Sequence, residues 1–90
     1  MEISFDPVKR LKSLEERGLD FADAAQIFDG PIFTREDGRF DYPEPRFQTF
    51  GLINDRLMMV VWTPTEKGMR VISMRKCNDR EQKAYARRLG

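Results

Sequence analysis

The sequence predicts one α+β domain, in which an antiparallel β-sheet meander packs against an N-terminal helix pair and a C-terminal helix. Two observations carry this prediction. Apolar residues recur at helical spacing in the first thirty residues, and from residue 46 to residue 76 they form strand-like runs separated by turn residues. Because 90 residues suffice for one core and are too few for two, residues 1–90 are expected to form a single domain.

The beginning of the chain predicts a short strand followed by a helix. Ile3 and Phe5 alternate with polar neighbours, as residues of a half-buried strand do. Asp6 can cap a helix that starts at Pro7, and Gly18 supplies a left-handed stop after Arg17. The apolar stripe of this helix has threefold spacing and is expected to face the core: Val8, Leu11 and Leu14.

A second helix is predicted between Asp20, which can cap it, and Gly30-Pro31, which closes it. One of its faces carries apolar and small side chains: Phe21, Ala24, Ala25 and Phe28. Because only a tight turn separates the two helices, they are expected to pack against each other as a hairpin.

The middle of the chain predicts the meander. Ile32 and Phe33 can start a strand, whereas residues 34–45 are polar and contain prolines, which favours a long loop or an edge ribbon. Three further strands are predicted, over residues 46–53, 57–62 and 69–76. Asn54-Asp55 is typical of a hairpin turn. The run over residues 57–62 is apolar throughout, which favours a central strand covered on both faces.

Charge is distributed unevenly along the chain. Residues 1–66 carry eight Lys/Arg and thirteen Asp/Glu, a net charge of −5, whereas residues 67–90 carry eight and two, a net charge of +6. Asn78 and Glu81 have the spacing of a capping box and predict a last helix to about Leu89. The basic segment favours a polyanion or an acidic partner. An ordinary solvated helix face is the alternative interpretation.

Composition excludes several kinds of site. The chain has one cysteine, Cys77, and no histidine, so an intrachain disulfide, a clustered Cys/His metal site and a histidine-based catalytic triad are excluded. No Walker-type loop or dinucleotide fingerprint is present, and no metal or cofactor is expected. No apolar stretch has the length of a membrane span and the N-terminus lacks signal-peptide features, so a cytoplasmic protein without membrane contact is expected.

The remaining candidates for chemistry are cationic. They lie on or one step beyond the predicted meander, and we expect them to converge over one part of the sheet: Arg46, Arg70, Arg75, Lys76 and Arg80. The planar guanidinium donates paired hydrogen bonds to phosphate. RNA can be cut without a metal when its own 2′-hydroxyl attacks the adjacent phosphorus, because the protein then has to position the groups and stabilise charge. Without histidine, proton transfer would fall to Lys76, Tyr85 or Glu44.

Motifs along nearly the whole chain resemble the BrnT family of bacterial toxins. They are residues 3–9, Arg17-Gly18-Leu19 with Phe21 and Ala24-Ala25, residues 28–31, Glu44-Pro45-Arg46, residues 70–76, Arg80-Glu81 and Tyr85. The most specific element is the strand ending in Ile72-Ser73, one further residue and Arg75-Lys76, followed by Arg80-Glu81 and the tyrosine.

The resemblance implies a RelE-like ribonuclease fold, an RNA-cleaving activity that inhibits translation, and a BrnA-type ribbon-helix-helix antitoxin. Operator DNA would be bound only through the antitoxin, in a heterotetramer of two toxins and two antitoxins. On the matching positions we expect catalytic roles for Arg46, Arg75, Lys76 and Arg80, and substrate binding by Glu44 and Tyr85; Ser73 and Glu81 also match. Arg17 and Arg70 are the further residues expected to bind the substrate. Family members commonly carry histidine where Arg17 stands here.

Two functions therefore remain open from the sequence. The first is a metal-independent ribonuclease that acts on single-stranded or ribosome-associated RNA. The second is a non-catalytic, charge-polarised binding module that holds an acidic antitoxin segment or nucleic acid. The missing histidine favours the second function, because it removes the most common general acid and base.

Overall fold

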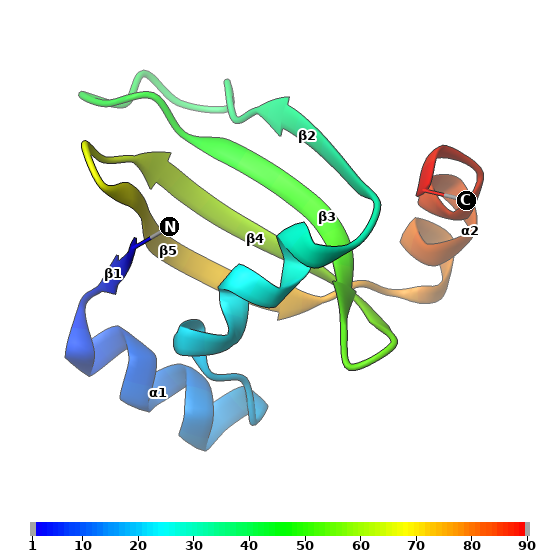
Figure 1. Ribbon diagram of the computed structural model, residues 1–90, viewed down its shortest axis with the longest axis horizontal. Coiled ribbons are helices and arrows are strands. Elements are labelled where there is room, and N and C mark those ends of the chain that lie inside the picture. The colour runs from blue at the N-terminus through cyan, green and yellow to red at the C-terminus, as the bar shows by residue number, and fades with distance from the viewer. Residues whose placement is uncertain (1, 90) are drawn as a thin grey trace.

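A five-stranded sheet forms the centre of the molecule (Figure 1). The computed structural model describes residues 2–89. The sheet order is β1-β5-β4-β3-β2, with β1 at Glu2–Phe5, β2 at Ile32–Glu36, β3 at Phe47–Ile53, β4 at Arg56–Pro64 and β5 at Gly68–Lys76. The helices are α1 at Pro7–Arg17, the 3₁₀ helix η1 at Phe21–Asp29, and α2 at Asp79–Leu89. No helix within residues 2–89 is long and apolar enough to cross a membrane.

The predicted antiparallel meander is confirmed from β2 to β5. The Asn54-Asp55 turn joins β3 to β4, and its two residues have φ angles of 51° and 61°, as a tight hairpin turn of this type requires. β4 lies at the centre of the sheet, and its buried side chains contribute to an apolar core on each face. The sheet as a whole is mixed, because β1 pairs in parallel with β5. No hairpin sets the direction of β1, so its pairing is settled by tertiary contacts.

η1 covers one face of the sheet, here called the helical face (Figure 1). Phe21, Ala24 and Ile27 are buried there and join a core that includes Val60 of β4 and Met69 of β5. The segment was predicted as a helix and forms one of the 3₁₀ type, capped by Asp20 as expected. η1 therefore covers the helical face with apolar side chains, a role that was predicted for two helices together.

The predicted packing of α1 is wrong. Val8 and Leu11 are 75% and 56% exposed, whereas Ser13 is buried. The capped ends at Asp6 and Gly18 are as predicted. The predicted hairpin of two helices is not confirmed, because α1 borders β5 at the side of the sheet while η1 lies against β3, β1 and β5. Since η1 already occupies the helical face, Val8 and Leu11 are left facing solvent, and Leu14 alone of the predicted stripe is half-buried.

The polar segment after Pro31 contains more regular structure than its composition predicts. β2 continues through Glu36, so residues 34–36 form the edge ribbon and only the following residues form a loop. Arg46 precedes β3, which begins at Phe47. The Asp37 N–H donates to the Arg46 carbonyl at 2.7 Å, so the two ends of the loop are tied together.

Candidate active site

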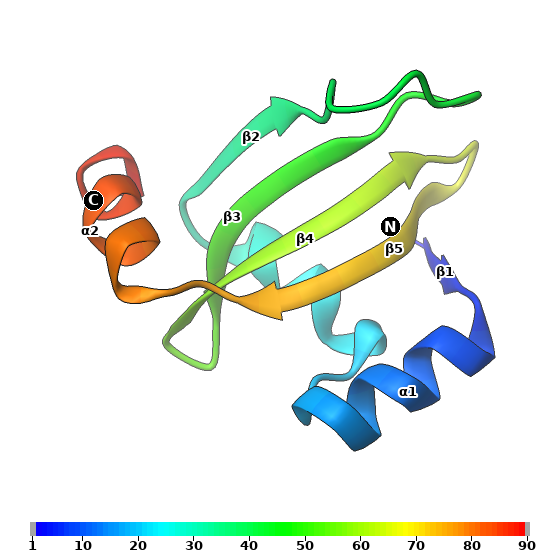
Figure 2. The same ribbon diagram turned by 180° about the vertical axis from the view of Figure 1, so that it is seen from behind.

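Alternation along the strands, with the one-residue register shift of β5 opposite Val61 and Trp62, places four arginines on the sheet face opposite η1. Figure 2 shows the sheet from the side of this face. The strand register forms two rows of side chains on this face. They are Phe33, Phe50, Met59 and Arg75 in one row, and Arg35, Gln48, Val61 and Ser73 in the next. Arg46 stands two residues before Gln48, and Arg70 pairs with Thr63 one step further along. We call this surface the arginine face, defined by Arg35, Arg46, Arg70 and Arg75.

Arg75 is held by a carboxylate from α2. Its Nη1 and Nη2 donate to the two oxygens of Glu81, each at 2.8 Å. The hydrogen bonds from Arg75 lower the pKa of Glu81 to about 2, and the same pairing raises the pKa of Arg75. Glu81 also forms the predicted capping box, since its Oε1 accepts from the Asn78 N–H at 3.0 Å and its own N–H donates to Asn78 Oδ1 at 2.8 Å. Glu81 is therefore ionised at neutral pH and serves both the cap and the ion pair.

An aromatic layer lies beside this ion pair. The Tyr85 ring stacks on Phe50 with centroids 4.0 Å apart and an interplanar angle of 15°. Arg35 lies over the Phe50 ring at 5.3 Å from its centroid, and Arg88 lies over Phe33 at 4.5 Å. Flat rings and guanidinium groups of this kind suit the stacking of nucleic-acid bases.

Arg46 lies at the other end of the arginine face and carries its own partners. Its Nε and Nη2 donate to Glu44 Oε1, each at 3.2 Å, and its guanidinium lies 4.0 Å from the Tyr42 ring centroid. Arg70 is exposed on β5. Thr63, the strand partner of Arg70, donates its hydroxyl to the Pro45 carbonyl, so the segment that holds Arg46 is bound to the same end of the sheet.

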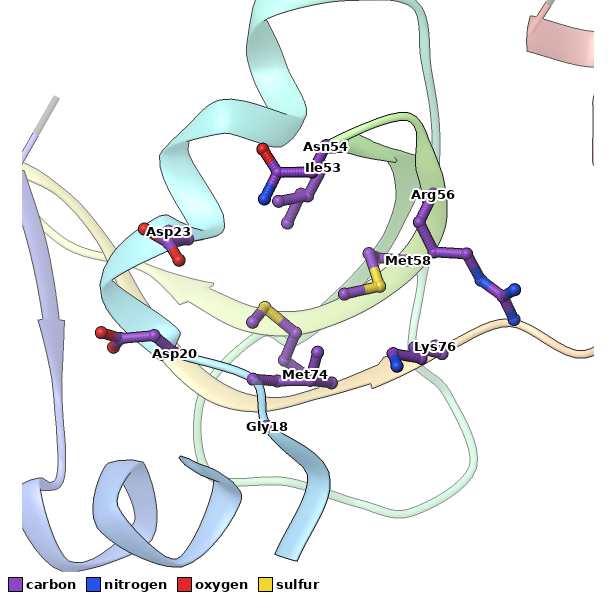
Figure 3. A pocket seen from close by; sticks show the side chains of 10 residues that line it. Gly18, Asp20, Asp23, Ile53, Asn54, Arg56, Met58, Met74 and Lys76 are labelled. Carbon is purple, nitrogen blue, oxygen red and sulfur yellow. The ribbon is translucent and has the colours of Figure 1, made fainter. Parts of the chain in front are cut away.

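The other predicted cationic residues lie elsewhere. Lys76 lines a cavity of about 220 Å³ on the helical face, together with Met58 and Met74 (Figure 3). Arg17 donates to the Met74 carbonyl at 2.9 Å. Arg80 is exposed on α2. The structure therefore gathers Arg46, Arg70 and Arg75 on one face, whereas Lys76 points to the opposite face, because neighbouring residues of a strand alternate.

Sequence reasoning missed Arg35 as a site residue. Arg35 lies in the segment predicted as a loop or edge ribbon, so the sequence did not assign its side chain to either face of the sheet. In β2 its Nε donates to Gln48 Oε1 at 2.8 Å, and it stands in the same row as Ser73. The alternation of Phe33 and Arg35 around Thr34 was the signal that could have found it.

The family of the chain follows from comparison with known proteins. The model of the ribonuclease toxin BrnT of type II toxin–antitoxin systems matches residues 5–81. The match includes Arg35, Arg46, Arg70 and the Arg75–Glu81 pair, and it ends before Tyr85. No curated protein matches the chain. Because the family model covers most of the sequence, the chain belongs to the BrnT family of ribonuclease toxins, whose type II systems pair each toxin with an antitoxin.

Proposed function

We propose that this BrnT toxin is a metal-independent endoribonuclease that binds its RNA along the arginine face and thereby inhibits translation in the cytoplasm. The observation that carries the proposal is the placement of Arg35, Arg70 and Arg75 on one face of the sheet beside stacked aromatic rings. Arginines on one face can donate to the phosphates of one RNA strand, while the rings bind bases. The family description as a ribonuclease toxin supports the same function.

In the proposed reaction, the 2′-hydroxyl of the RNA attacks the adjacent phosphorus. The O2′–P bond forms and the P–O5′ bond breaks, which leaves a 2′,3′-cyclic phosphate and a 5′-hydroxyl. Arg75 and Arg35 would donate to the non-bridging oxygens, where one well-placed donor contributes on the order of 3 kcal/mol. Arg70 and the Glu44–Arg46 pair would hold the flanking strand. Since the chain has no histidine, water would take up the proton of the 2′-hydroxyl and supply the one that the leaving oxygen needs.

The roles predicted for Lys76, Arg17 and Arg80 stay predictions. Lys76 lies on the far side of β5 from Arg75, and Arg17 lies at the edge of β5, where it lines a pocket with Ser73. The proposed reaction uses neither of them. For the partner we propose a BrnA-type ribbon-helix-helix antitoxin, through which alone the toxin would contact operator DNA, in a heterotetramer of two toxins and two antitoxins. The toxin–antitoxin family of the chain supports an antitoxin partner.

A labelled RNA incubated with the purified chain in EDTA tests the reaction. We expect fragments that end in cyclic phosphate. A double substitution, Arg35→Ala with Arg70→Ala, should abolish these fragments. Neither arginine forms an ion pair on the arginine face, so the substitution removes two phosphate donors without freeing a carboxylate. The double variant Lys67→Ala with Lys83→Ala removes the same charge from exposed positions outside that face and is the matched control. Fragments that appear only after metal is added would contradict the proposal.

One observation favours the alternative of a binding module without turnover. In the free chain Glu81 already binds Arg75 through both carboxylate oxygens, so one phosphate donor of the face is occupied. Binding of the labelled RNA without any fragment, by a sample that still folds, would support the module and reject the enzyme.

A further inference from the structure

α2 contacts the arginine face through two side chains that stand one helical turn apart. Glu81 and Tyr85 are separated by four residues, so they project from the same side of the helix. Glu81 binds Arg75 and Tyr85 stacks on Phe50. Phe50 and Arg75 belong to one row across β3, β4 and β5, two strand spacings or about 10 Å apart. α2 thus contacts both ends of this row, Arg75 with the Glu81 carboxylate and Phe50 with the Tyr85 ring.

The carboxylate of Glu81 binds Arg75 in the manner of a phosphate. Both oxygens accept, at 2.8 Å each, in the paired geometry by which guanidinium also recognises phosphate. The bound oxygens occupy the positions that two non-bridging oxygens of an RNA phosphate would take. A phosphate can therefore reach the Arg75 fork only after Glu81 leaves it.

The ring of Tyr85 covers Phe50 in the manner of a base. The near-parallel planes and the 4.0 Å centroid distance are those of a stacked pair. Phe50 itself is fully buried, although it lies on the sheet face that η1 does not cover. Aromatic side chains on a sheet are the usual platform for unstacked bases of single-stranded RNA. A base stacked on Phe50 would replace Tyr85.

α2 is held on the face by few contacts. Glu81, Gln82 and Tyr85 are half-buried, and every other residue from 79 to 88 is exposed. Figure 2 shows the helix at one end of the sheet, beside the start of β2, joined to β5 by a short connection. Since no side chain of residues 79–88 is fully buried, the helix itself gives up little buried surface when it leaves the sheet. Its departure uncovers the Phe50 ring, and a base stacked on that ring would cover it again.

We propose that α2 is an internal substitute for RNA: Phe50 and Arg75 form a nucleotide site that takes a base and a phosphate of single-stranded RNA, and Tyr85 and Glu81 occupy that site in the free toxin. RNA binding then requires α2 to move away from Phe50 and Arg75. The inference rests on the proposed function for the choice of RNA as ligand, but the site binds whether or not cleavage follows.

Glu81→Gln tests the phosphate half of this proposal. Glutamine also serves in a capping box, so the start of α2 is preserved while the ion pair with Arg75 is lost. Asp79→Asn is the matched control, because it removes one negative charge from the same helix at an exposed position that does not contact Arg75. The probe is a fluorescent 2′-O-methyl tetranucleotide in EDTA, which lacks the attacking hydroxyl and reports binding alone. Loss of a partly exposed ion pair should tighten binding by Glu81→Gln about fivefold over Asp79→Asn.

Hydrogen exchange of the unmodified chain tests displacement without any substitution. Saturation with the same probe should speed amide exchange over residues 79–88, since the helix loses its contacts with the sheet. Equal affinities of Glu81→Gln and Asp79→Asn, or slower exchange in α2 on binding, would overturn the inference. Tighter binding by Glu81→Gln with no cut in unmodified RNA would support the inference and reject the ribonuclease. Cleavage by the unmodified chain, with no tighter binding by Glu81→Gln than by Asp79→Asn, would support the ribonuclease and reject the inference.

Discussion

Gly51 is the point where β3 and η1 approach most closely, and its replacement by alanine should destabilise the fold. A Cβ at this position would lie 2.6 Å from Ile27 Cγ1, 3.2 Å from the Ile27 carbonyl oxygen and 3.2 Å from Ile32 Cγ2. Ile27 is fully buried, so its side chain has no free space to turn into. Because the backbone oxygen is also too close, η1 itself has to shift away from the sheet.

The cost of Gly51→Ala can be estimated from these contacts. Overpacking by one carbon in a dense core costs about 1–3 kcal/mol. The lower chain entropy of alanine in the unfolded state offsets about 0.5–1 kcal/mol of this. The midpoints of these ranges leave a net loss of about 1 kcal/mol in the free energy of unfolding, which corresponds to a fall in Tm on the order of 4–8 °C for a domain of this size.

Thermal and urea unfolding followed by circular dichroism measure this loss. Gly30→Ala is the matched control, because a Cβ at Gly30 meets no atom within 4 Å and its φ of −127° suits any residue. The control should stay within about 0.5 kcal/mol of the unmodified chain. If Gly51→Ala were as stable as Gly30→Ala, η1 could not be packed on β3 as described.

Two further predictions follow from the ionisable groups. The Arg75 hydrogen bonds depress the pKa of Glu81 in the folded chain to about 2, so its contribution to stability is complete above its ordinary value of 4.5 and is lost as the pH falls toward 2. Because Arg75 is 42% exposed, screening keeps this contribution at or below about 1 kcal/mol, and urea unfolding of Glu81→Gln between pH 6 and pH 2.5 should show a correspondingly smaller decline. Cys77 is fully buried and burial raises its pKa to about 11, so an aromatic disulfide reagent should label it only at the rate of unfolding. Labelling that is fast in the native state and does not change with urea would contradict its burial.

The meander could be predicted from the sequence because its signals are local. The Asn54-Asp55 turn and the apolar run of β4 act within a few residues of each other, and both survive in the structure. The position of β1 depends instead on pairing with Gly68–Val71, more than sixty residues away, for which no local pattern exists. The exposure of Val8 and Leu11 has a similar origin. An apolar stripe shows which side of a helix prefers burial, but not that η1 has already covered the available sheet face.

The candidate site could be predicted in part for the same reason. Arg70 follows Met69 and Arg75 follows Met74, and both methionines belong to the helical-face core, so local alternation assigns each arginine to the other face. The two arginines are five residues apart and share that face because the register of β5 shifts by one residue opposite Val61 and Trp62, which strict alternation from the sequence does not predict. The same rule separates Lys76 from Arg75, although both were expected to converge on one pocket. Charge clusters and family motifs group residues that are close in sequence. Neighbouring residues of a strand, however, point to opposite faces of the sheet. For residues on strands, the side-chain period is therefore a stronger guide to a shared site than nearness in sequence.

Glu81 shows how a local signal and a tertiary contact can meet in one side chain. Its spacing from Asn78 predicts the capping box, and the cap fixes one carboxylate oxygen against the Asn78 N–H. The turn that leads into the helix is fixed in turn, because the Cys77 N–H donates to the Leu57 carbonyl and Arg56 donates to the Cys77 carbonyl at 2.7 Å. Because both the cap and the turn before it are fixed, the Glu81 carboxylate points toward β5, the strand that precedes α2. The ion pair with Arg75 therefore follows from the cap and the turn, and a longer connection between β5 and α2 would break it while leaving the cap intact.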